Sequence, residues 1–365
     1  MAGQARTARS LEDLVAAGAL DAAALDGENG ATLRDVGRRF AVAITPEVLA
    51  NLGTADPASD PIARQFVPTL DEATITADEL ADPIGDEAHQ PLKGIVHRYP
   101  DRVLLKLLHA CPVYCRFCFR REMVGPGGDA LDPAETEAAL AYIRERPAIR
   151  EVILSGGDPL MLSPRRLREV TTALDAMAHV GTIRLHSRVP VVDSARIGPA
   201  MVRALQAPRA AVWLAVHCNH VRELTPAARA ALRRLSDGGI PLVSQTVLLR
   251  GVNDDAATLE DLFRTLVECR VKPYYLHHGD LAPGTAHWRT SIEEGQALMR
   301  ELRGRLSGLC QPTYVLDIPG GHGKSPIGPG YLEQVGVSGT AHYRVTDFNG
   351  RPHAYPPVAA VPSRR

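Results

Sequence analysis

Short apolar runs rich in Val, Ile and Leu alternate with stretches of helical periodicity between about residue 100 and residue 318. Asp132-Pro133, Ser163-Pro164 and Thr225-Pro226 supply recurrent cap-plus-proline starts for the helices. Near-continuous apolar strands that alternate with helices favour parallel strands buried on both faces and joined by right-handed crossovers. Since the repeats are too few for a complete eight-unit barrel, we expect an α/β fold with a partial (β/α)6 barrel. The apolar runs are residues 102–109, 151–155, 182–189, 211–217, 241–249, 272–277 and 313–318.

Three cysteines follow the first apolar run, with the spacing Cys111-x3-Cys115-x2-Cys118. Functional sites assemble at the carboxyl ends of parallel strands, so this loop is a candidate site. A [4Fe–4S] cluster contains four irons that thiolates normally ligate, and three cysteines would leave one iron open to another ligand. A zinc knuckle is the alternative; zinc sites usually have a second Cys/His pair nearby, and His109 is the only close candidate.

Two glycine-containing segments follow other strands. Ser155-Gly156-Gly157-Asp158 comes after the second apolar run; its glycines would let the backbone approach a ligand, and the same residues also form ordinary turns. The segment 317–326, Asp-Ile-Pro-Gly-Gly-His-Gly-Lys-Ser-Pro, carries Lys324. It lacks the spacing of a phosphate-binding Walker loop, and Pro326 would break the helix that such a loop opens. Lysine also forms Schiff bases with pyridoxal 5′-phosphate (PLP), and this is the interpretation that we favour for Lys324.

These three motifs, in this order, resemble those of lysine 2,3-aminomutase and its relatives, which are radical S-adenosylmethionine (SAM) enzymes. The resemblance runs from about Pro91 to Tyr331. It implies a radical SAM barrel in which Cys111, Cys115 and Cys118 hold a [4Fe–4S] cluster and the open iron chelates SAM. An electron from the cluster would then cleave SAM to a 5′-deoxyadenosyl radical. The resemblance also implies that Lys324 is the residue that holds PLP.

The resemblance assigns further residues to the cofactors and the substrate. The residues implied near the PLP phosphate and ring are Arg98, Tyr99 and Arg102. The residues implied to contact SAM are Ser155, Gly156, Gly157 and Asp158. The residues implied to face the cofactors from strand ends are Gln245, Asn219 and His220. Arg120 is implied to receive the amino-acid carboxylate, because a guanidinium can bind a carboxylate with two hydrogen bonds; a surface arginine is the alternative. Asp280 and Asp317 are implied to hold a lysine side-chain ammonium, which would be costly to bury unpaired; a turn and a strand-end cap are the alternatives.

The chain also departs from the family's pattern. Clostridial-type members hold a structural zinc with cysteines, one after a Gly-Val-Asn-Asp segment and others near the C-terminus. Here Asp255 follows that segment and no cysteine comes after Cys310, so we expect no structural zinc. His322 interrupts a run that is often all glycine, and His277 replaces a frequent tyrosine. The cysteines outside the motif are expected to be small buried residues: Cys218, Cys269 and Cys310.

We therefore predict an isomerase that depends on PLP and SAM and interconverts L-lysine and β-lysine by moving an amino group between C2 and C3. The rivals are an elongation factor P-type enzyme that forms (R)-β-lysine, a related aminomutase for glutamate or arginine, a radical SAM enzyme without PLP, and a non-catalytic iron–sulfur protein. The presence of both Asp280 and Asp317 favours free lysine. The resemblance further implies a reducing electron donor of the flavodoxin or ferredoxin type, and it allows a homo-oligomer.

The net charge and the distribution of apolar residues limit which partners and which cellular location we expect. The formal net charge of −1 gives no electrostatic reason to expect nucleic acid or an anionic membrane as a partner. The opening Met1 to Arg9 is polar, and no apolar run reaches membrane-spanning length, so we expect a cytoplasmic location, where an oxygen-sensitive cluster would survive. We expect three parts: a helical accessory region over residues 1–90, the barrel over 91–318, and the PLP-lysine loop with a C-terminal tail over 319–365.

Overall fold

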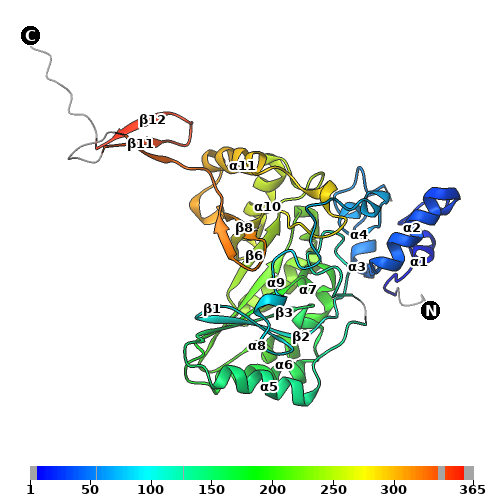
Figure 1. The fold of residues 1–365 in the computed structure, drawn as a ribbon, viewed down its shortest axis with the longest axis horizontal. Helices are drawn as coiled ribbons and strands as arrows, with labels where there is room; N and C mark the ends of the chain where they lie inside the picture. Colours follow the sequence, from blue (N-terminus) through cyan, green and yellow to red (C-terminus); the bar gives the residue numbers. More distant parts are fainter. Residues whose placement is uncertain (1–5, 55, 126, 336–341, 357–365) are drawn as a thin grey trace, which may run out of the picture.

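The computed structural model describes residues 6–54, 56–125, 127–335 and 342–356, and its centre is a nine-stranded sheet (Figure 1). The order of the strands in the sheet follows their order in the chain, β1 to β9. Strands β2 to β8 pair in parallel, whereas β1 and β9 join the two edges in antiparallel orientation. The strands are β1 (Ile95–Tyr99), β2 (Arg102–Leu108), β3 (Glu151–Gly156), β4 (Thr182–Ser187), β5 (Ala211–His217), β6 (Leu242–Val247), β7 (Val271–His277), β8 (Thr313–Ile318) and β9 (Gly323–Pro326).

This topology confirms the predicted partial barrel. Each apolar run of the sequence matches one of the parallel strands β2 to β8 to within a few residues. Helices connect successive strands, so that six βα units are followed by a final strand. The sheet is open, because β1 and β9 occupy its two edges and are not paired with each other in the described part of the chain. Because strands β2 to β8 are parallel, their carboxyl ends lie at the same end of the barrel, where functional loops gather.

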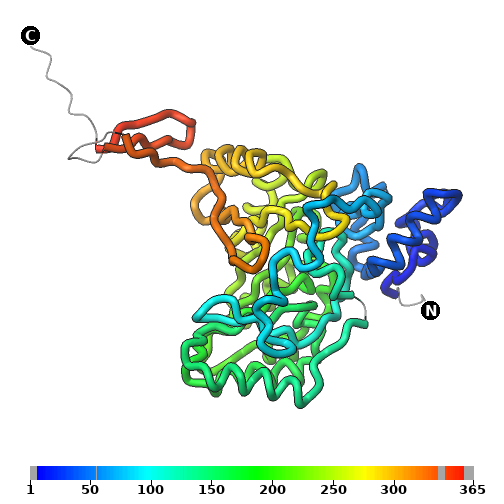
Figure 2. Tube along the Cα trace, in the orientation of Figure 1, coloured from blue at the N-terminus to red at the C-terminus, as the bar shows by residue number. Residues whose placement is uncertain are grey.

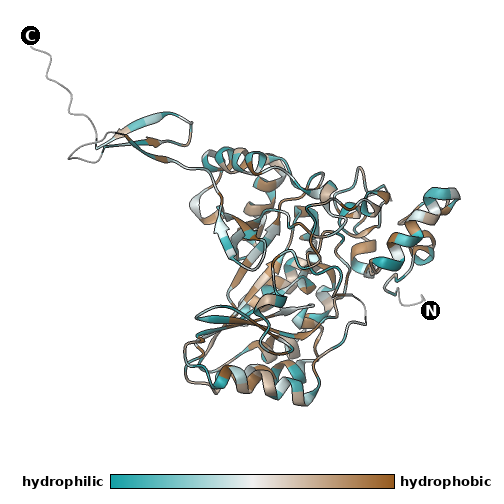
Figure 3. Ribbon diagram, viewed as in Figure 1, coloured by the Kyte–Doolittle hydropathy of each residue, from teal (hydrophilic) through white to brown (hydrophobic). Residues whose placement is uncertain are grey.

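Three helices of the barrel begin at the cap-plus-proline positions that the sequence predicts, and a fourth begins at Ser291. The side chains of Asp132, Ser163, Thr225 and Ser291 each accept a hydrogen bond from the backbone N–H three residues further on, which satisfies a donor that the helix leaves free. Their apolar residues belong to the same buried cluster as those of the strands, and Figure 3 shows brown and teal residues alternating along these helices. The helices are α5 (Pro133–Arg144), α6 (Pro164–Asp175), α7 (Val189–Val192), α8 (Pro199–Leu205), α9 (Pro226–Asp237), α10 (Ala256–Glu268) and α11 (Ile292–Arg305).

The N-terminal region is helical and shares its core with the barrel. Leu14 and Phe66 are buried in the same apolar cluster as Leu105 of β2 and Val152 of β3. Figure 2 shows the segment after residue 70 running from the N-terminal helices across the barrel to β1. Within the described residues, none of the helices combines the length and apolar composition of a membrane span. The elements are α1 (Leu11–Ala16), α2 (Gly27–Arg39), α3 (Pro46–Leu49) and α4 (Ala63–Phe66), with short 3-10 helices at η1 (Ala22–Leu25), η2 (Leu70–Ala73) and η3 (Glu87–His89).

The C-terminal part differs from the predicted loop and tail. Lys324 lies on strand β9, where it pairs with Asp317 of β8. Residues 332–335 and 342–355 contribute a separate antiparallel sheet, which projects from the body of the molecule (Figure 1). Its strands are β10 (Leu332–Val335), β11 (His342–Thr346) and β12 (Pro352–Tyr355). Part of the predicted C-terminal tail is therefore a strand, β12, and residues 357–365 lie outside the described part. Every residue of β12 is exposed, so these strands carry no buried face that would reveal them in the sequence.

Candidate functional site

A cavity of about 490 Å³ lies inside the barrel and reaches the loops at the carboxyl ends of its parallel strands. It is lined by every residue that the sequence assigns to a cluster, a cofactor or the substrate, except Asn219 and His220. Because the loops after β2, β3 and β4 and the strands β5 to β9 all contribute to the lining, residues from position 98 to position 324 meet in one space.

The cysteine loop follows β2, and the N-terminal region holds its backbone. The N–H of Tyr114 donates to the carbonyl of Ala43 (2.8 Å), and the N–H of Arg116 donates to the carbonyl of Gln65 (2.9 Å). The thiols of the motif are all free, and burial raises their pKa values, that of Cys118 to about 11. Iron binding would therefore have to displace protons from these thiols.

The three sulfurs form a soft thiolate donor set, which suits an iron–sulfur cluster. Among the described residues, no three or more His, Cys, Asp or Glu side chains are grouped as ligands of a single metal ion. A cubane has no need for such a group, because each cysteine ligates a different iron. The donor types and the shared loop therefore fit the cluster that the spacing predicts.

Three buried acids at positions 72, 79 and 86 connect the N-terminal region to the loops of the cavity; their side chains are at most 1% exposed. Glu72 pairs with Arg116 and Arg121, in and just after the cysteine loop. Glu79 accepts hydrogen bonds from the backbone N–H groups of residues 284 and 285, in the loop after β7. Asp86 pairs with Arg120. The region that we predict to be accessory thus contributes buried ion pairs and hydrogen bonds to the loops of the site.

We expect the substitution Glu72→Gln to destabilise the folded protein strongly. Burial alone would raise the pKa of Glu72, but the charges of Arg116 and Arg121 outweigh it and lower the pKa, so the carboxylate is ionised. Removing it leaves two buried guanidinium groups without their counter-ion, which typically costs about 3–5 kcal/mol. Urea unfolding of the cluster-free protein would measure the loss. The matched control is Glu137→Gln, whose carboxylate forms an exposed ion pair; equal stability of the two variants would contradict the role of Glu72.

The Gly-Gly-Asp segment lines the cavity, and its glycines are explained by a close approach of two loops. A Cβ atom on Gly156 (φ +100°) would lie 2.9 Å from the carbonyl oxygen of Leu108, and one on Gly157 would lie 2.4 Å from that of Ala110. The N–H of Gly157 donates to Leu108 O (2.7 Å) and the N–H of Asp158 to Ala110 O (2.9 Å). The steric need for glycine therefore comes from the end of β2 and the start of the cysteine loop. Contact of this backbone and of Ser155 with SAM stays a prediction.

The carboxylate of Asp158 accepts hydrogen bonds from the protein itself, although Asp158 lines the cavity, and its contact with SAM stays a prediction. Its two oxygens accept hydrogen bonds from Ser187 Oγ (2.8 and 3.0 Å) and from the backbone N–H groups of Leu160, Arg188 and Val189. A carboxylate offers about four acceptor sites, and these donors occupy them. Asp158 therefore positions the loop that follows β4.

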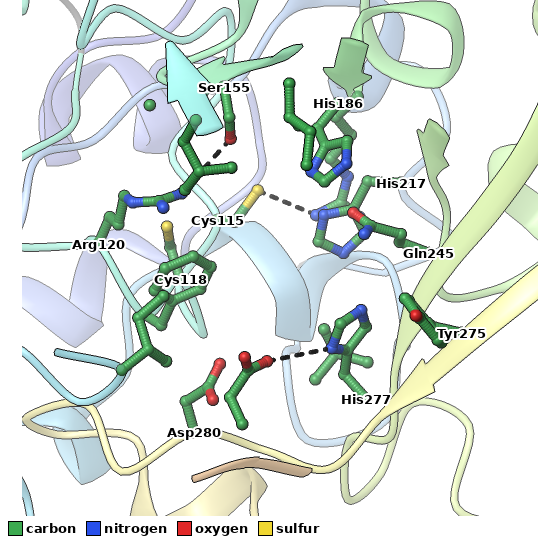
Figure 4. A pocket seen from close by; sticks show the side chains of 18 of the residues that line it. Cys115, Cys118, Arg120, Ser155, His186, His217, Gln245, Tyr275, His277 and Asp280 are labelled. Atoms are coloured by element: carbon green, nitrogen blue, oxygen red, sulfur yellow. Dashed lines mark hydrogen bonds and ion pairs between the residues drawn. The ribbon is translucent and has the colours of Figure 1, made fainter. Parts of the chain in front are cut away.

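Asn219 and His220 do not line the cavity, so the prediction that they face the cofactors is wrong. Asn219 is fully buried; its Oδ1 accepts from the N–H of Val247 (2.9 Å) and its Nδ2 donates to Gln65 Oε1 (3.1 Å). His220 Nδ1 accepts from the N–H of Arg222 (3.1 Å) and caps the 3-10 helix η6 (Val221–Glu223). The chain turns away from the cavity after β5, and Gln245 of β6 lines it instead (Figure 4).

Lys324 meets an acid at the edge of the cavity. Its Nζ lies 2.6 Å from both carboxylate oxygens of Asp317, and its backbone N–H donates to Tyr99 Oη (2.8 Å). Arg102 stacks over the ring of Tyr99 at 3.8 Å. Gly323 (φ +89°) has to be glycine, because a Cβ atom would lie 2.5 Å from Tyr99 Oη. Strand β1 thus fixes the position of the lysine through Tyr99.

Two predicted arginines share one buried acid. Arg120 donates from Nε (3.0 Å) and Nη2 (2.8 Å) to Asp86 Oδ2, while its Nη1 lies 3.5 Å from Ser155 Oγ (Figure 4). Arg98 donates to Asp86 Oδ1 (3.3 Å) and to the carbonyl of Ile84 (2.6 Å). Asp86 therefore occupies one edge of the Arg120 guanidinium, and the Nη1 side remains for a ligand.

Asp280 and Asp317 lie at the same end of the cavity and differ in ionisation. Burial, reinforced by the negative charge of Asp317, raises the pKa of Asp280 to about 7. For Asp317, burial alone would raise the pKa, but His277 (Nδ1 at 3.6 Å) and Lys324 outweigh it and lower the pKa. Figure 4 shows Asp280 beside the carboxylate that faces His277. At neutral pH this end of the cavity therefore holds one acid paired with a lysine and one poised near its titration midpoint.

His186 and His217 also belong to the site but are not predicted from the sequence, where His277 is noted only as a departure from the family pattern. They lie at or next to the carboxyl ends of β4, β5 and β7 and face the cavity (Figure 4). Their Nε2 atoms are buried and have no hydrogen-bond partner in the described part of the chain. Burial lowers the pKa of each, so they are neutral near pH 7. Their position at strand ends is the signal that could have identified them.

Comparisons with known proteins identify relatives over most of this architecture. Residues 105–263 match the model of the Radical SAM superfamily. The chain is 42% identical over 291 residues to L-lysine 2,3-aminomutase of Clostridium subterminale, a match that covers 80% of this chain and 70% of that protein. It is 36% identical over 305 residues to glutamate 2,3-aminomutase of Clostridioides difficile (84% and 72%) and 35% identical over 294 residues to L-lysine 2,3-aminomutase of Escherichia coli (80% and 85%).

Proposed function

Because the chain belongs to the lysine 2,3-aminomutase family of radical SAM enzymes, we propose that this isomerase interconverts L-lysine and β-lysine by moving the amino group between C2 and C3. The observation that carries the proposal is the pair Asp280 and Asp317 at one end of the cavity, with Arg120 among the other lining residues. Two acids suit a terminal ammonium, and a guanidinium suits the carboxylate of an amino acid.

Membership of the family supports a [4Fe–4S] cluster and SAM as cofactors. We assign the cluster to Cys111, Cys115 and Cys118, which face the cavity from one loop. When bound, the cluster and SAM would supply the radical chemistry that the reaction needs. The task of the protein is to hold the substrate in one orientation and to exclude water and oxygen from the cavity.

Several residues that line the cavity fit PLP. Lys324 offers an amine, Arg98 and Arg102 offer positive charge for a phosphate, and the unpaired Nε2 atoms of His186 and His277 offer polar contacts in an enclosed space. PLP, when bound, would stabilise a substrate radical while the nitrogen migrates. Asp317 lies within reach of the Lys324 amine, so it can hold the proton on that amine whenever the lysine is not joined to PLP.

The acids also separate lysine from glutamate, the substrate named for one relative. A side-chain carboxylate of glutamate would face Asp280 and Asp317, and like charges in a buried site repel. An anaerobic assay of the reconstituted enzyme with a panel of lysine, glutamate, arginine and alanine tests this. We expect a strong preference for lysine, and a preference for glutamate or alanine would overturn the substrate assignment while leaving the family intact.

The remaining proposals concern the surroundings of the enzyme. A one-electron reductant of the flavodoxin or ferredoxin type would supply electrons to the cluster, and the oxygen sensitivity of such a cluster favours the cytoplasm.

We also propose that the chain is divided into a helical region (1–90), a barrel (91–318) and a C-terminal part that carries Lys324 (319–365). The shared core of the first two parts, which includes Leu14 and Leu105, indicates that they fold as one unit.

We expect borohydride reduction of the PLP-loaded enzyme to attach the cofactor permanently to Lys324, because reduction converts the hydrolysable C=N bond into a secondary amine. Peptide mapping by mass spectrometry would locate the pyridoxyl label. Lys106 and Lys272 are internal controls: Lys106 is buried beside Asp86, and Lys272 donates to the carbonyls of Pro273 and Gln311. A label on either of them, or on no lysine, would refute the assignment.

A further inference from the structure

We propose that Arg188 is a positioning residue that raises the reduction potential of the cluster through a hydrogen bond to the sulfur of Cys115. The inference rests on the cluster assignment made above. Arg188 directly follows β4, and its Nη1 lies 3.0 Å from Cys115 Sγ, the contact drawn as a dashed line at Cys115 in Figure 4. Its side chain is 5% exposed. None of the substrate or cofactor roles proposed above uses this buried cation.

Several contacts hold the Arg188 guanidinium in this place. Its Nη2 donates to Gln65 Oε1 (2.5 Å) and Glu223 Oε2 (2.6 Å), and the backbone N–H of Arg188 donates to Asp158 Oδ2 (2.7 Å). The rings of Phe66 and Phe117 lie 4.5 and 5.4 Å from the guanidinium carbon. The guanidinium can leave the sulfur only by breaking a buried ion pair, so the contact is fixed by the fold.

The contact singles out one of the three cysteines. Within the described part of the chain, no side chain donates a hydrogen bond to the sulfur of Cys111 or Cys118, whereas Cys115 receives a charge-assisted bond from Arg188. Charge-assisted hydrogen bonds are roughly twice as strong as neutral ones. The Arg188 bond is therefore the contact through which a single side-chain substitution can change the electrostatics of the cluster.

The sign of the effect follows from charge. Reduction adds one electron to the cluster and makes its sulfurs more negative, so a cation that donates to a sulfur stabilises the reduced form more than the oxidised form. Hydrogen bonds to the sulfurs are among the factors that set the potentials of iron–sulfur clusters. Glu223 opposes Arg188, because its negative charge offsets part of that of the guanidinium. The net charge of the Arg188–Glu223 pair therefore influences the reduction potential of the cluster. Weakening the contact of Arg188 should lower this potential, and removing the charge of Glu223 should raise it.

Two variants of the full-length, anaerobically reconstituted protein test this by redox titration of the cluster signal in electron paramagnetic resonance, without SAM or substrate. Arg188→Lys keeps a charge beside Glu223, but a single ammonium cannot reach sulfur, Gln65 and Glu223 together. We expect full iron content and, at the wild-type midpoint potential, about a tenfold lower ratio of reduced to oxidised cluster, which is about 59 mV for one electron. Glu223→Gln removes the opposing charge and should shift the potential upward.

The opposite signs distinguish tuning from a merely structural role, which would lower iron content in both variants. Arg184→Lys is the matched control, since Arg184 lines the same cavity but pairs with Glu151 and has no bond to sulfur; its potential should equal that of the wild type. An unchanged potential in iron-loaded Arg188→Lys, or weaker SAM binding with an unchanged potential, overturns the inference. If Arg188→Lys assembles no cluster, the Glu223→Gln variant tests the inference alone. An unshifted or lowered reduction potential in Glu223→Gln then overturns the inference. Wild-type protein without iron would instead refute the cluster assignment.

Discussion

Replacing Cys111, Cys115 or Cys118 with alanine is expected to abolish both the cluster and the cleavage of SAM. Reconstituted wild-type protein should hold about four iron atoms per chain, as a cubane requires. The motif supplies three ligands from one loop, so loss of any one would leave two irons without a protein ligand. We expect loss of the broad iron–sulfur absorption and of 5′-deoxyadenosine formation, measured by iron analysis and chromatography.

Cys218→Ala is the matched control for these variants. Cys218 is fully buried just after β5, but it is not part of the cavity lining, so its variant should keep iron and SAM cleavage. Buried backbone contacts, such as that of Tyr114 N–H with Ala43 O (2.8 Å), hold the cysteine loop independently of the thiols. We therefore expect the cysteine variants to remain folded, which circular dichroism would check. Stoichiometric zinc in the wild type, with no iron absorption, would refute the cluster.

The barrel could be predicted from the sequence because its strands are buried on both faces. In β3, residues 152–155 are all buried, so the strand appears as an apolar run, and caps such as Asp132 mark the helices between runs. The C-terminal sheet gave no such signal, since its side chains are mostly exposed. Burial is what makes an element visible in the sequence.

The site could be predicted in outline because loops at the carboxyl ends of parallel strands must meet. What stayed hidden are the supporting contacts. Asp86 pairs with Arg120 across 34 residues of sequence, and Glu72 pairs with Arg116 across 44, and no local periodicity encodes such distances. Asp158 shows the converse: its motif is recognisable, but the donors that occupy its carboxylate come from the next strand and loop. Motifs therefore indicate where a site lies better than which atom touches the ligand.

Asp280→Asn and Asp317→Asn are expected to impair the turnover of lysine by roughly 10²–10³-fold. Removing one member of a buried charged contact typically costs about 3–5 kcal/mol, and about 1.36 kcal/mol corresponds to a factor of ten in rate. Iron content and SAM cleavage without product should persist, because neither acid touches the cysteine motif. Asp317→Asn also removes the partner of Lys324, so its PLP content has to be measured beside its activity, and Asp280→Asn is the cleaner test.

The raised pKa of Asp280 adds a pH dependence to this prediction. Burial and the charge of Asp317 raise that pKa to about 7, so the carboxyl is neutral below this pH and ionised above it. An ammonium binds the ionised form, so the apparent KM for lysine should fall as the pH rises through about 7, by up to roughly tenfold per unit on the acid side. Asp280→Asn should remove this dependence.

The exposed ion pair of Asp237 with Arg270 provides the control, and Asp237→Asn should keep both the rate and the pH profile of the wild type. If Asp280→Asn turns over lysine at the wild-type rate, or keeps the wild-type dependence of KM on pH, Asp280 does not hold the substrate ammonium. The cofactor assignments would survive that result, because they depend on the cysteine motif and Lys324 and not on this acid.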